Sequence, residues 1–151
     1  MALPKPKLNK KITLNGACRS STRTDVTTRD VGVTIDEPWG TNHGLNPIET
    51  LVSSLIGCTN VTTHKLAEVN GVEIDAMSIE AELAYDQRGV MFVEEIDVPF
   101  TEITLKIELI SAVDDAALAK IKADLPRFCP LAKAIRQSGT RIIENWTVTR
   151  P

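Results

Sequence analysis

The segment at residues 46–69 constrains this chain most, because its pattern predicts a long and largely buried helix. It reads NPIETLVSSLIGCTNVTTHKLAEV. Asn46 is suited to cap the first turn, Pro47 fits the first helical position, and Glu49 stands three residues after the cap, as in a capping box. The apolar residues that follow recur at helical spacing: Ile48, Leu51, Val52, Leu55 and Ile56. Between Pro47 and Thr63 the one charged residue is Glu49, so much of this helix should lie inside the protein.

Two cysteines occupy positions that need an explanation. Cys58 stands near the middle of the predicted helix, where a free cysteine most often serves as a small core residue. Cys129 precedes Pro130 at the predicted start of a short helix, where backbone amides and the helix dipole favour the thiolate. The alternative for Cys129 is a cysteine packed beneath the preceding loop together with Phe128.

Composition limits the classes of protein to consider. The 151 residues predict a single domain spanning 1–151, with 42% hydrophobic and 25% charged residues, as in ordinary globular proteins. A net charge of -3 and 4% aromatic residues argue against nucleic-acid binding. No apolar run approaches membrane-spanning length, and the N-terminus lacks the apolar core of a signal peptide, so we expect a cytoplasmic protein. In that compartment a cysteine pair is more often catalytic or metal-binding than a structural disulfide.

The pattern along the chain predicts an α+β fold with mostly antiparallel sheet. After an irregular arm at residues 1–8, three strands are expected at 12–14, 20–28 and 31–35, with a turn at Asn15-Gly16. Two more strands, at 79–85 and 103–109, flank a long connection at 86–99. A helix capped by Asp114 or Asp115 and ended by Pro126, a second helix from Cys129-Pro130 to Gly139, and a strand at 141–149 complete the order. A helix that is apolar on more than one face also predicts burial in a dimer.

The cysteine pair would permit one specific chemistry. A thiolate attacks the O–O bond of a peroxide and becomes a sulfenic acid, a second thiol condenses with it to a disulfide, and an external dithiol reduces that disulfide. This chemistry requires the two sulfur atoms to come within bonding reach. Two other hypotheses stay open: a protein that binds an apolar or thiol ligand without turnover, and a structural dimer with cysteines in its core. His43 and His64 fit no metal-ligand spacing, and no cofactor or metal is expected.

The segment NPIETLVSSLIGC on a long helix, followed far along the chain by FCPLAKAI, resembles the OsmC/Ohr family of osmotically inducible and organic hydroperoxide resistance proteins. The flanking VTIDEP and RIIENWTV match the family's strands, so the resemblance covers nearly the whole chain. It implies an intertwined homodimer in which two long helices pack centrally and the sheets wrap around them. It also implies reduction of organic hydroperoxides in oxidative or osmotic stress, with a lipoyl-type dithiol as reductant.

The resemblance also implies the roles of individual residues. Cys58 would be the attacking cysteine and Cys129 the resolving one, although the dipole alone favours Cys129 as the more acidic thiol. The family's catalytic arginine, counted back from the proline of DEP, falls at Arg23. Arg19 and Arg29 are neighbouring alternatives, and each of the three could instead be an exposed strand residue.

One position departs from the pattern of Ohr-type peroxidases, which place a carboxylate directly after the proline to hold the arginine. This chain has Ile48 there and Glu49 one residue later. At about 100° per residue, Glu49 lies on the opposite side of the helix from Cys58, which favours the capping role. The chain therefore resembles the OsmC-like branch. Its substrate pocket is expected near the dimer interface, lined by Trp39 or Phe128.

Overall fold

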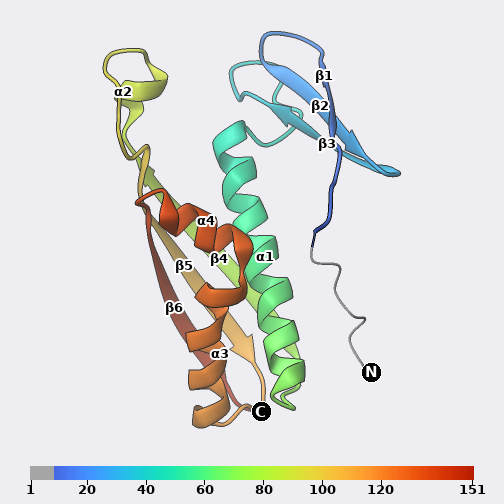
Figure 1. The fold of residues 1–151 in the computed structure, drawn as a ribbon, viewed down its shortest axis with the longest axis vertical. Coiled ribbons are helices and arrows are strands. Elements are labelled where there is room, and N and C mark those ends of the chain that lie inside the picture. The colour runs from blue at the N-terminus through green and yellow to red at the C-terminus, as the bar shows by residue number, and fades with distance from the viewer. Residues whose placement is uncertain (1–8) are drawn as a thin grey trace. The chain divides into compact units, whose positions relative to one another are not determined.

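The structure is a computed structural model that describes residues 9–151 (Figure 1). The irregular arm predicted at residues 1–8 lies outside these residues. The chain divides into two compact units, Met1–Thr50 and Leu51–Pro151. The elements in order are β1 (Asn15–Cys18), β2 (Arg23–Thr28), β3 (Val31–Asp36), α1 (Pro47–Val69), β4 (Ala76–Tyr85), α2 (Gln87–Val90), β5 (Phe100–Ile110), α3 (Asp115–Phe128), α4 (Pro130–Gln137) and β6 (Arg141–Thr149). The predicted α+β class is thereby confirmed.

The first unit holds a three-stranded antiparallel sheet in the order β1-β2-β3. The strand predicted at residues 12–14 is wrong, because those residues have no strand partner and the pairing begins at Asn15, opposite Thr27. The turn also lies later than predicted. It is made at residues 19–22, where the Ser20 hydroxyl accepts hydrogen bonds from the backbone N–H groups of Thr22 and Arg23. A serine that bonds its own turn therefore replaces the expected Asn-Gly turn.

A buried carboxylate organises the loop after β3. Asp36 is fully buried, and its Oδ2 accepts hydrogen bonds from the Thr41 hydroxyl and from the His43 backbone N–H. These hydrogen bonds lower the pKa of Asp36, and the one from Thr41 has the largest effect. The carboxyl group is therefore ionised at neutral pH. The charge ties the loop back onto the end of β3.

The capping box predicted for α1 is confirmed. The Asn46 side chain accepts a hydrogen bond from the Glu49 backbone N–H at 2.8 Å, and the Glu49 carboxylate accepts one from the Asn46 backbone N–H at 2.9 Å. The helix ends before Gly71, whose φ of 67° is the left-handed conformation that glycine adopts without strain. Its inward face carries Val52, Leu55, Thr59, Thr63 and Ala67. In residues 9–151, no helix is both long enough and apolar enough to pass through a membrane.

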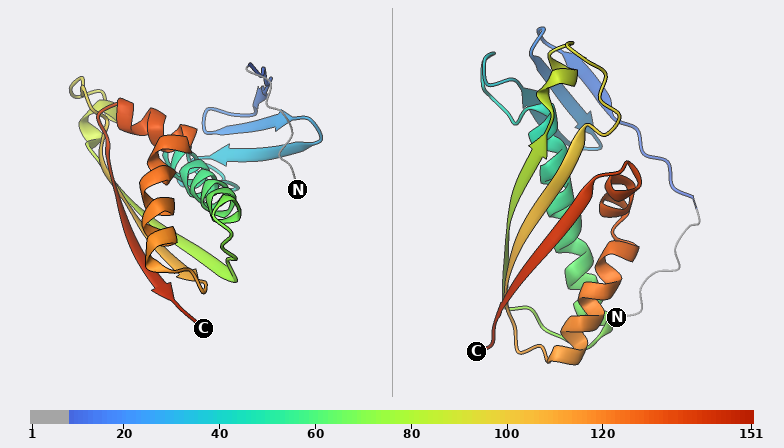
Figure 2. Two further views of the ribbon diagram at one scale, coloured as in Figure 1. Left: turned by 60° about the horizontal axis from the view of Figure 1, so that its bottom comes forward. Right: turned by 90° about the vertical axis from the view of Figure 1, so that its left-hand side faces the viewer.

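The second unit holds the sheet β4-β5-β6, with α1, α3 and α4 on one of its faces (Figures 1 and 2). β4 and β5 pair antiparallel, from Ala76 opposite Ile110 to Tyr85 opposite Phe100. β6 pairs parallel to β5, whereas β1-β2, β2-β3 and β4-β5 pair antiparallel, so the mostly antiparallel sheet that was predicted is confirmed. β6 runs parallel to β5 because α3 and α4 form a crossover and return the chain to the end of the sheet where β5 began.

The core of this unit follows the alternation along β5. Ile103, Leu105, Ile107 and Leu109 are each at most 2% exposed, whereas Lys106 between them is exposed. Each fully buried side chain of this size stabilises the fold by about 1.5–3 kcal/mol. The apolar face of β5 thus packs against the helices, and its polar face is exposed to solvent.

The two short helices join at a single residue. Asp114 caps α3 by accepting from the Ala117 backbone N–H at 2.7 Å, as one of the two predicted caps. Pro126 lies inside the last turn, so the prediction that it ends the helix is wrong by two residues. Cys129 is both the C-cap of α3 and the N-cap of α4.

Candidate active site at a cysteine pair

Cys58 lies in the middle of α1 and is half-buried. Its side chain packs against the main core cluster of the second unit, which includes Leu55, Leu125 and Ile135. One helical turn further along, the Thr62 Oγ1 lies 3.9 Å from the Cys58 Sγ. The attacking cysteine predicted from the sequence is therefore a partly accessible thiol at the edge of an apolar core.

Cys129 is fully buried at the junction of α3 and α4. Its backbone N–H donates to the Leu125 carbonyl at 3.0 Å, and its Sγ accepts from the Ala132 backbone N–H at 3.4 Å. Pro130 occupies the first position of α4, where its missing N–H costs no helical hydrogen bond. The thiol is therefore held by backbone on both sides, so its position is set by the two helices.

The structure brings these two sulfur atoms into contact. The Cys129 thiol donates a hydrogen bond to the Cys58 Sγ over 2.6 Å, and the cysteines are separated by 71 positions in the chain. All three cysteines, including the exposed Cys18 on β1, are free thiols. A disulfide bond requires a sulfur separation of about 2.05 Å, so Cys58 and Cys129 need only a short approach to form one.

The acidity expected for Cys129 from the helix dipole is wrong. Burial, and to a smaller extent the hydrogen bond with Cys58, raise the pKa of the Cys129 thiol to about 11. The backbone N–H of Ala132 lowers it, as the dipole argument expects, but this effect is smaller. Loss of hydration outweighs the dipole because the thiol is fully enclosed, so Cys129 stays protonated at neutral pH.

Three arginines were considered from the sequence as the activating cation. Arg23 lies on β2, where its Nε donates to the Asp25 carboxylate at 3.1 Å, and Arg19 donates to the same carboxylate at 3.0 Å. Arg29 lies in the turn between β2 and β3, with a φ of 52°. All three belong to the Met1–Thr50 unit, while Cys58 and Cys129 belong to the second unit, so contact between Arg23 and Cys58 stays a prediction.

Asp25 was not found from the sequence. It accepts hydrogen bonds from Arg19, from Arg23 and from the Thr34 hydroxyl at 2.9 Å, and these interactions lower the pKa of its carboxyl to about 2. Glu49, by contrast, is engaged in the capping box with Asn46. Asp25 is two positions from Arg23 on the same strand, so both side chains point to the same face of the sheet. This spacing is the feature of the sequence that could have predicted their pairing.

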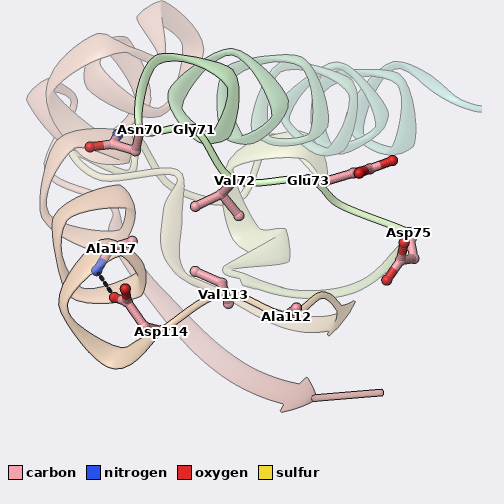
Figure 3. A pocket seen from close by; sticks show the side chains of 9 residues that line it. All are labelled: Asn70, Gly71, Val72, Glu73, Asp75, Ala112, Val113, Asp114 and Ala117. Atoms are coloured by element: carbon pink, nitrogen blue, oxygen red, sulfur yellow. Dashed lines mark hydrogen bonds between the residues drawn. The ribbon is translucent and has the colours of Figure 1, made fainter.

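The aromatic residues expected to line a substrate pocket are both exposed. Trp39 is 75% exposed, and Phe128 is 60% exposed with the Arg127 guanidinium 5.5 Å from its ring centre. A pocket of about 380 Å³ lies elsewhere, between the turn after α1 and the segment leading into α3, where Glu73, Asp75 and Asp114 line it (Figure 3). Asn70 in this pocket is about 18 Å from Cys58 along the axis of α1. The pocket is therefore separate from the cysteine pair.

The fold and the site together define an α+β protein whose helices bring two distant thiols into contact. The sequence model that describes OsmC-like proteins matches residues 40–145. The chain therefore belongs to the OsmC-like protein family, as the resemblance implied. No curated protein matches the sequence.

Solved structures of low sequence identity share the fold. An OsmC-like protein from Mycoplasma pneumoniae is 18% identical, with a TM-score of 0.75 over 95% of this chain and 99% of that chain. An organic hydroperoxide resistance protein OsmC from Legionella pneumophila is 15% identical, with a TM-score of 0.65 over 95% and 99%. The organic hydroperoxide resistance protein OhrB of Bacillus subtilis is 17% identical, with a TM-score of 0.59 over 93% and 98%.

Proposed function

We propose that this chain is a thiol-dependent peroxidase that reduces organic hydroperoxides through Cys58 and Cys129. The observation that carries the proposal is the 2.6 Å separation of their sulfur atoms. Membership of the OsmC-like family supports it, as do structural neighbours that are described as organic hydroperoxide resistance proteins. A pair of thiols in contact has the geometry that sulfenic acid and disulfide chemistry needs.

The surroundings of the two thiols support a division of roles. Cys129 is fully buried and has a raised pKa, so at neutral pH it is a protonated thiol without access to a peroxide. Cys58 is half-buried and accepts the hydrogen bond from Cys129. We therefore assign the attack to Cys58 and the resolving step to Cys129.

The proposed reaction balances in two steps. The Cys58 thiolate attacks the terminal oxygen of ROOH, the S–O bond forms as the O–O bond breaks, and the released alkoxide takes a proton from water to become ROH. The Cys129 sulfur then attacks the Cys58 Sγ, and the S–O bond breaks as the S–S bond forms. The leaving hydroxide takes the Cys129 proton and becomes water. Two thiols are oxidised to a disulfide, and the hydroperoxide is reduced to an alcohol and water.

Turnover requires an external reductant, for which we propose a dithiol of the lipoyl type. Its thiolate attacks the Cys58–Cys129 disulfide, and its second thiol displaces the protein from the mixed disulfide, which leaves the reductant as a cyclic disulfide. Such a cycle suits the cytoplasm, where thiols are kept reduced, and we propose that location.

The activating cation is assigned to Arg23 on the family resemblance. The Asp25 carboxylate holds the Arg23 guanidinium at 3.1 Å, so the side chain is oriented rather than free. A guanidinium stays charged at every physiological pH and favours an adjacent thiolate. Arg19 and Arg29 stay the alternatives.

We also propose that the protein works as a homodimer. In the described part of the first unit, residues 9–50, Asp36 is the only buried residue. A three-stranded sheet needs an apolar face covered by other structure to be stable. The large apolar residues that stand exposed in this unit are Ile12, Leu14, Val31, Val33, Trp39 and Leu45. A second copy would cover them, and sedimentation velocity should give twice the chain mass, reduced toward one chain by Val33→Asp.

Counting free thiols tests the proposed reaction. One equivalent of cumene hydroperoxide per chain should remove two thiols from the wild type and from Cys18→Ser, one from Cys129→Ser, and none rapidly from Cys58→Ser. Slow, non-stoichiometric loss that is unaffected by Cys58→Ser would contradict the proposal. That outcome would favour a protein that binds an apolar or thiol ligand without turnover.

A further inference from the structure

The Cys58 sulfur has a second polar neighbour besides Cys129. The Thr62 Oγ1 lies 3.9 Å from the Cys58 Sγ. Residues four apart on a helix lie on the same face, one turn above each other, so this contact is set by α1 alone. Thr62 is half-buried, like Cys58, so both side chains are partly accessible to solvent.

The charge on Cys58 decides which atom donates. Between a neutral thiol and a hydroxyl, either atom can be the donor, but a thiolate has no proton and can only accept. Hydrogen bonds to an ionised acceptor are roughly twice as strong as those between neutral groups. The interaction of Thr62 with Cys58 is therefore stronger in the ionised form than in the neutral form.

We propose that Thr62 is a further functional residue of the site, whose hydroxyl donates to the Cys58 sulfur in the thiolate and to the oxygen of the Cys58 sulfenic acid. The inference rests on the proposed role of Cys58 as the attacking thiol. The Thr62 hydroxyl lies one helical turn after Cys58 on α1. The contact therefore needs no residue of the Met1–Thr50 unit. Thr62 thus stabilises charge at the attacking atom, while Cys129 supplies the second thiol.

The neighbouring Thr63 provides a matched control. It lies on the same helix and is fully buried, and its Oγ1 has no hydrogen-bond partner among the described residues. Thr62→Val and Thr63→Val make the same isosteric change at adjacent positions, and only the first removes a hydroxyl from Cys58. Thr62→Ser restores the hydroxyl without the methyl group.

The test measures Cys58 directly and does not depend on peroxide turnover. The reduced full-length protein is treated with iodoacetamide at neutral pH, and the initial rate of Cys58 alkylation is followed by peptide mass spectrometry. A hydrogen bond of about 1 kcal/mol corresponds to a change of about fivefold. Thr62→Val should therefore lower the ultraviolet absorbance of the thiolate about fivefold and slow alkylation of Cys58 about twofold to threefold, because the less stabilised thiolate is the better nucleophile. Thr62→Ser and Thr63→Val should keep the wild-type absorbance and rate.

Equal alkylation rates in the wild type and Thr62→Val would overturn the inference, as would Thr62→Ser reacting as slowly as Thr62→Val. Circular dichroism and a thermal melt confirm that each variant is folded before its rate is compared. The failure of the proposed peroxidase reaction would appear separately, as unchanged thiol counts after cumene hydroperoxide in the wild type.

Discussion

The Cys129 thiol points at the Cys58 sulfur from the junction of two short helices, and the two sulfur atoms lie 2.6 Å apart. This arrangement predicts what happens when the second thiol is removed. In Cys129→Ser, treatment with cumene hydroperoxide should leave Cys58 as a sulfenic acid that dimedone traps, because no nearby thiol can condense with it. Mass spectrometry of the wild type should show instead a disulfide between the peptides of Cys58 and Cys129. A dimedone adduct of equal yield in both proteins would contradict the resolving role.

The raised pKa of Cys129 predicts a loss of stability in alkali. An unfolded cysteine ionises near pH 8.5, whereas burial raises the pKa of Cys129 to about 11 in the folded protein. The folded state therefore holds its proton more tightly, and the free energy of unfolding should fall as the pH rises from about 8.5 to 11. Urea unfolding across that range measures the slope. Cys129→Ala should reduce it and Cys18→Ser should keep it, and an unchanged slope in Cys129→Ala would rule out the assigned cause.

The pKa of Asp25 should depend on its two arginines. Its carboxyl, which Arg19, Arg23 and Thr34 hydrogen-bond, has a pKa of about 2 against about 3.9 in an unfolded chain. Because the folded-state pKa is the lower one, the stabilisation from Asp25 is present above about pH 4 and is lost as the pH falls toward 2. Carboxyl-carbon NMR should show the pKa rising toward 3.9 in Arg19→Ala and in Arg23→Ala, with little change in Arg29→Ala. The same titration midpoint in all four proteins would contradict this arrangement.

Arg23 should also be distinguished from its neighbours by kinetics. If Arg23 activates Cys58, Arg23→Ala should lower the rate of Cys58 oxidation by cumene hydroperoxide by roughly tenfold or more. The reason is that an adjacent cation favours the thiolate and typically increases its equilibrium population by about tenfold or more. Stopped-flow measurements should find Arg19→Ala and Arg29→Ala close to the wild type. A larger loss in either of those two variants would move the cation to that residue.

The capping box at the start of α1 predicts a local contribution to stability. Asn46→Ala removes the side chain that accepts from the Glu49 backbone N–H and should lower the free energy of unfolding by about 1 kcal/mol. Asn60→Ala is the matched control, because Asn60 is exposed on the same helix. Urea denaturation measures both, and equal effects would show that the cap adds nothing specific.

Features that depend on neighbouring residues were predicted well. The capping box, the extent of α1, the alternation of β5 and the Asp114 cap follow from spacing within one or two helical turns or a few strand residues. The strand expected at 12–14 failed because an alternating pattern does not say whether a partner strand lies opposite. The direction of β6 was not predicted, for a related reason, since it is set by the crossover through α3 and α4.

By itself, the sequence determined the α+β class, the long helix that carries Cys58, and the family to which the chain belongs. Only the tertiary structure decided that the Cys129 sulfur would meet the Cys58 sulfur and that burial would outweigh the helix dipole at Cys129. The physical reason is that spacing and capping act over a few residues. The separation of two sulfur atoms 71 positions apart, and the water lost around one of them, depend on how helices pack on a sheet.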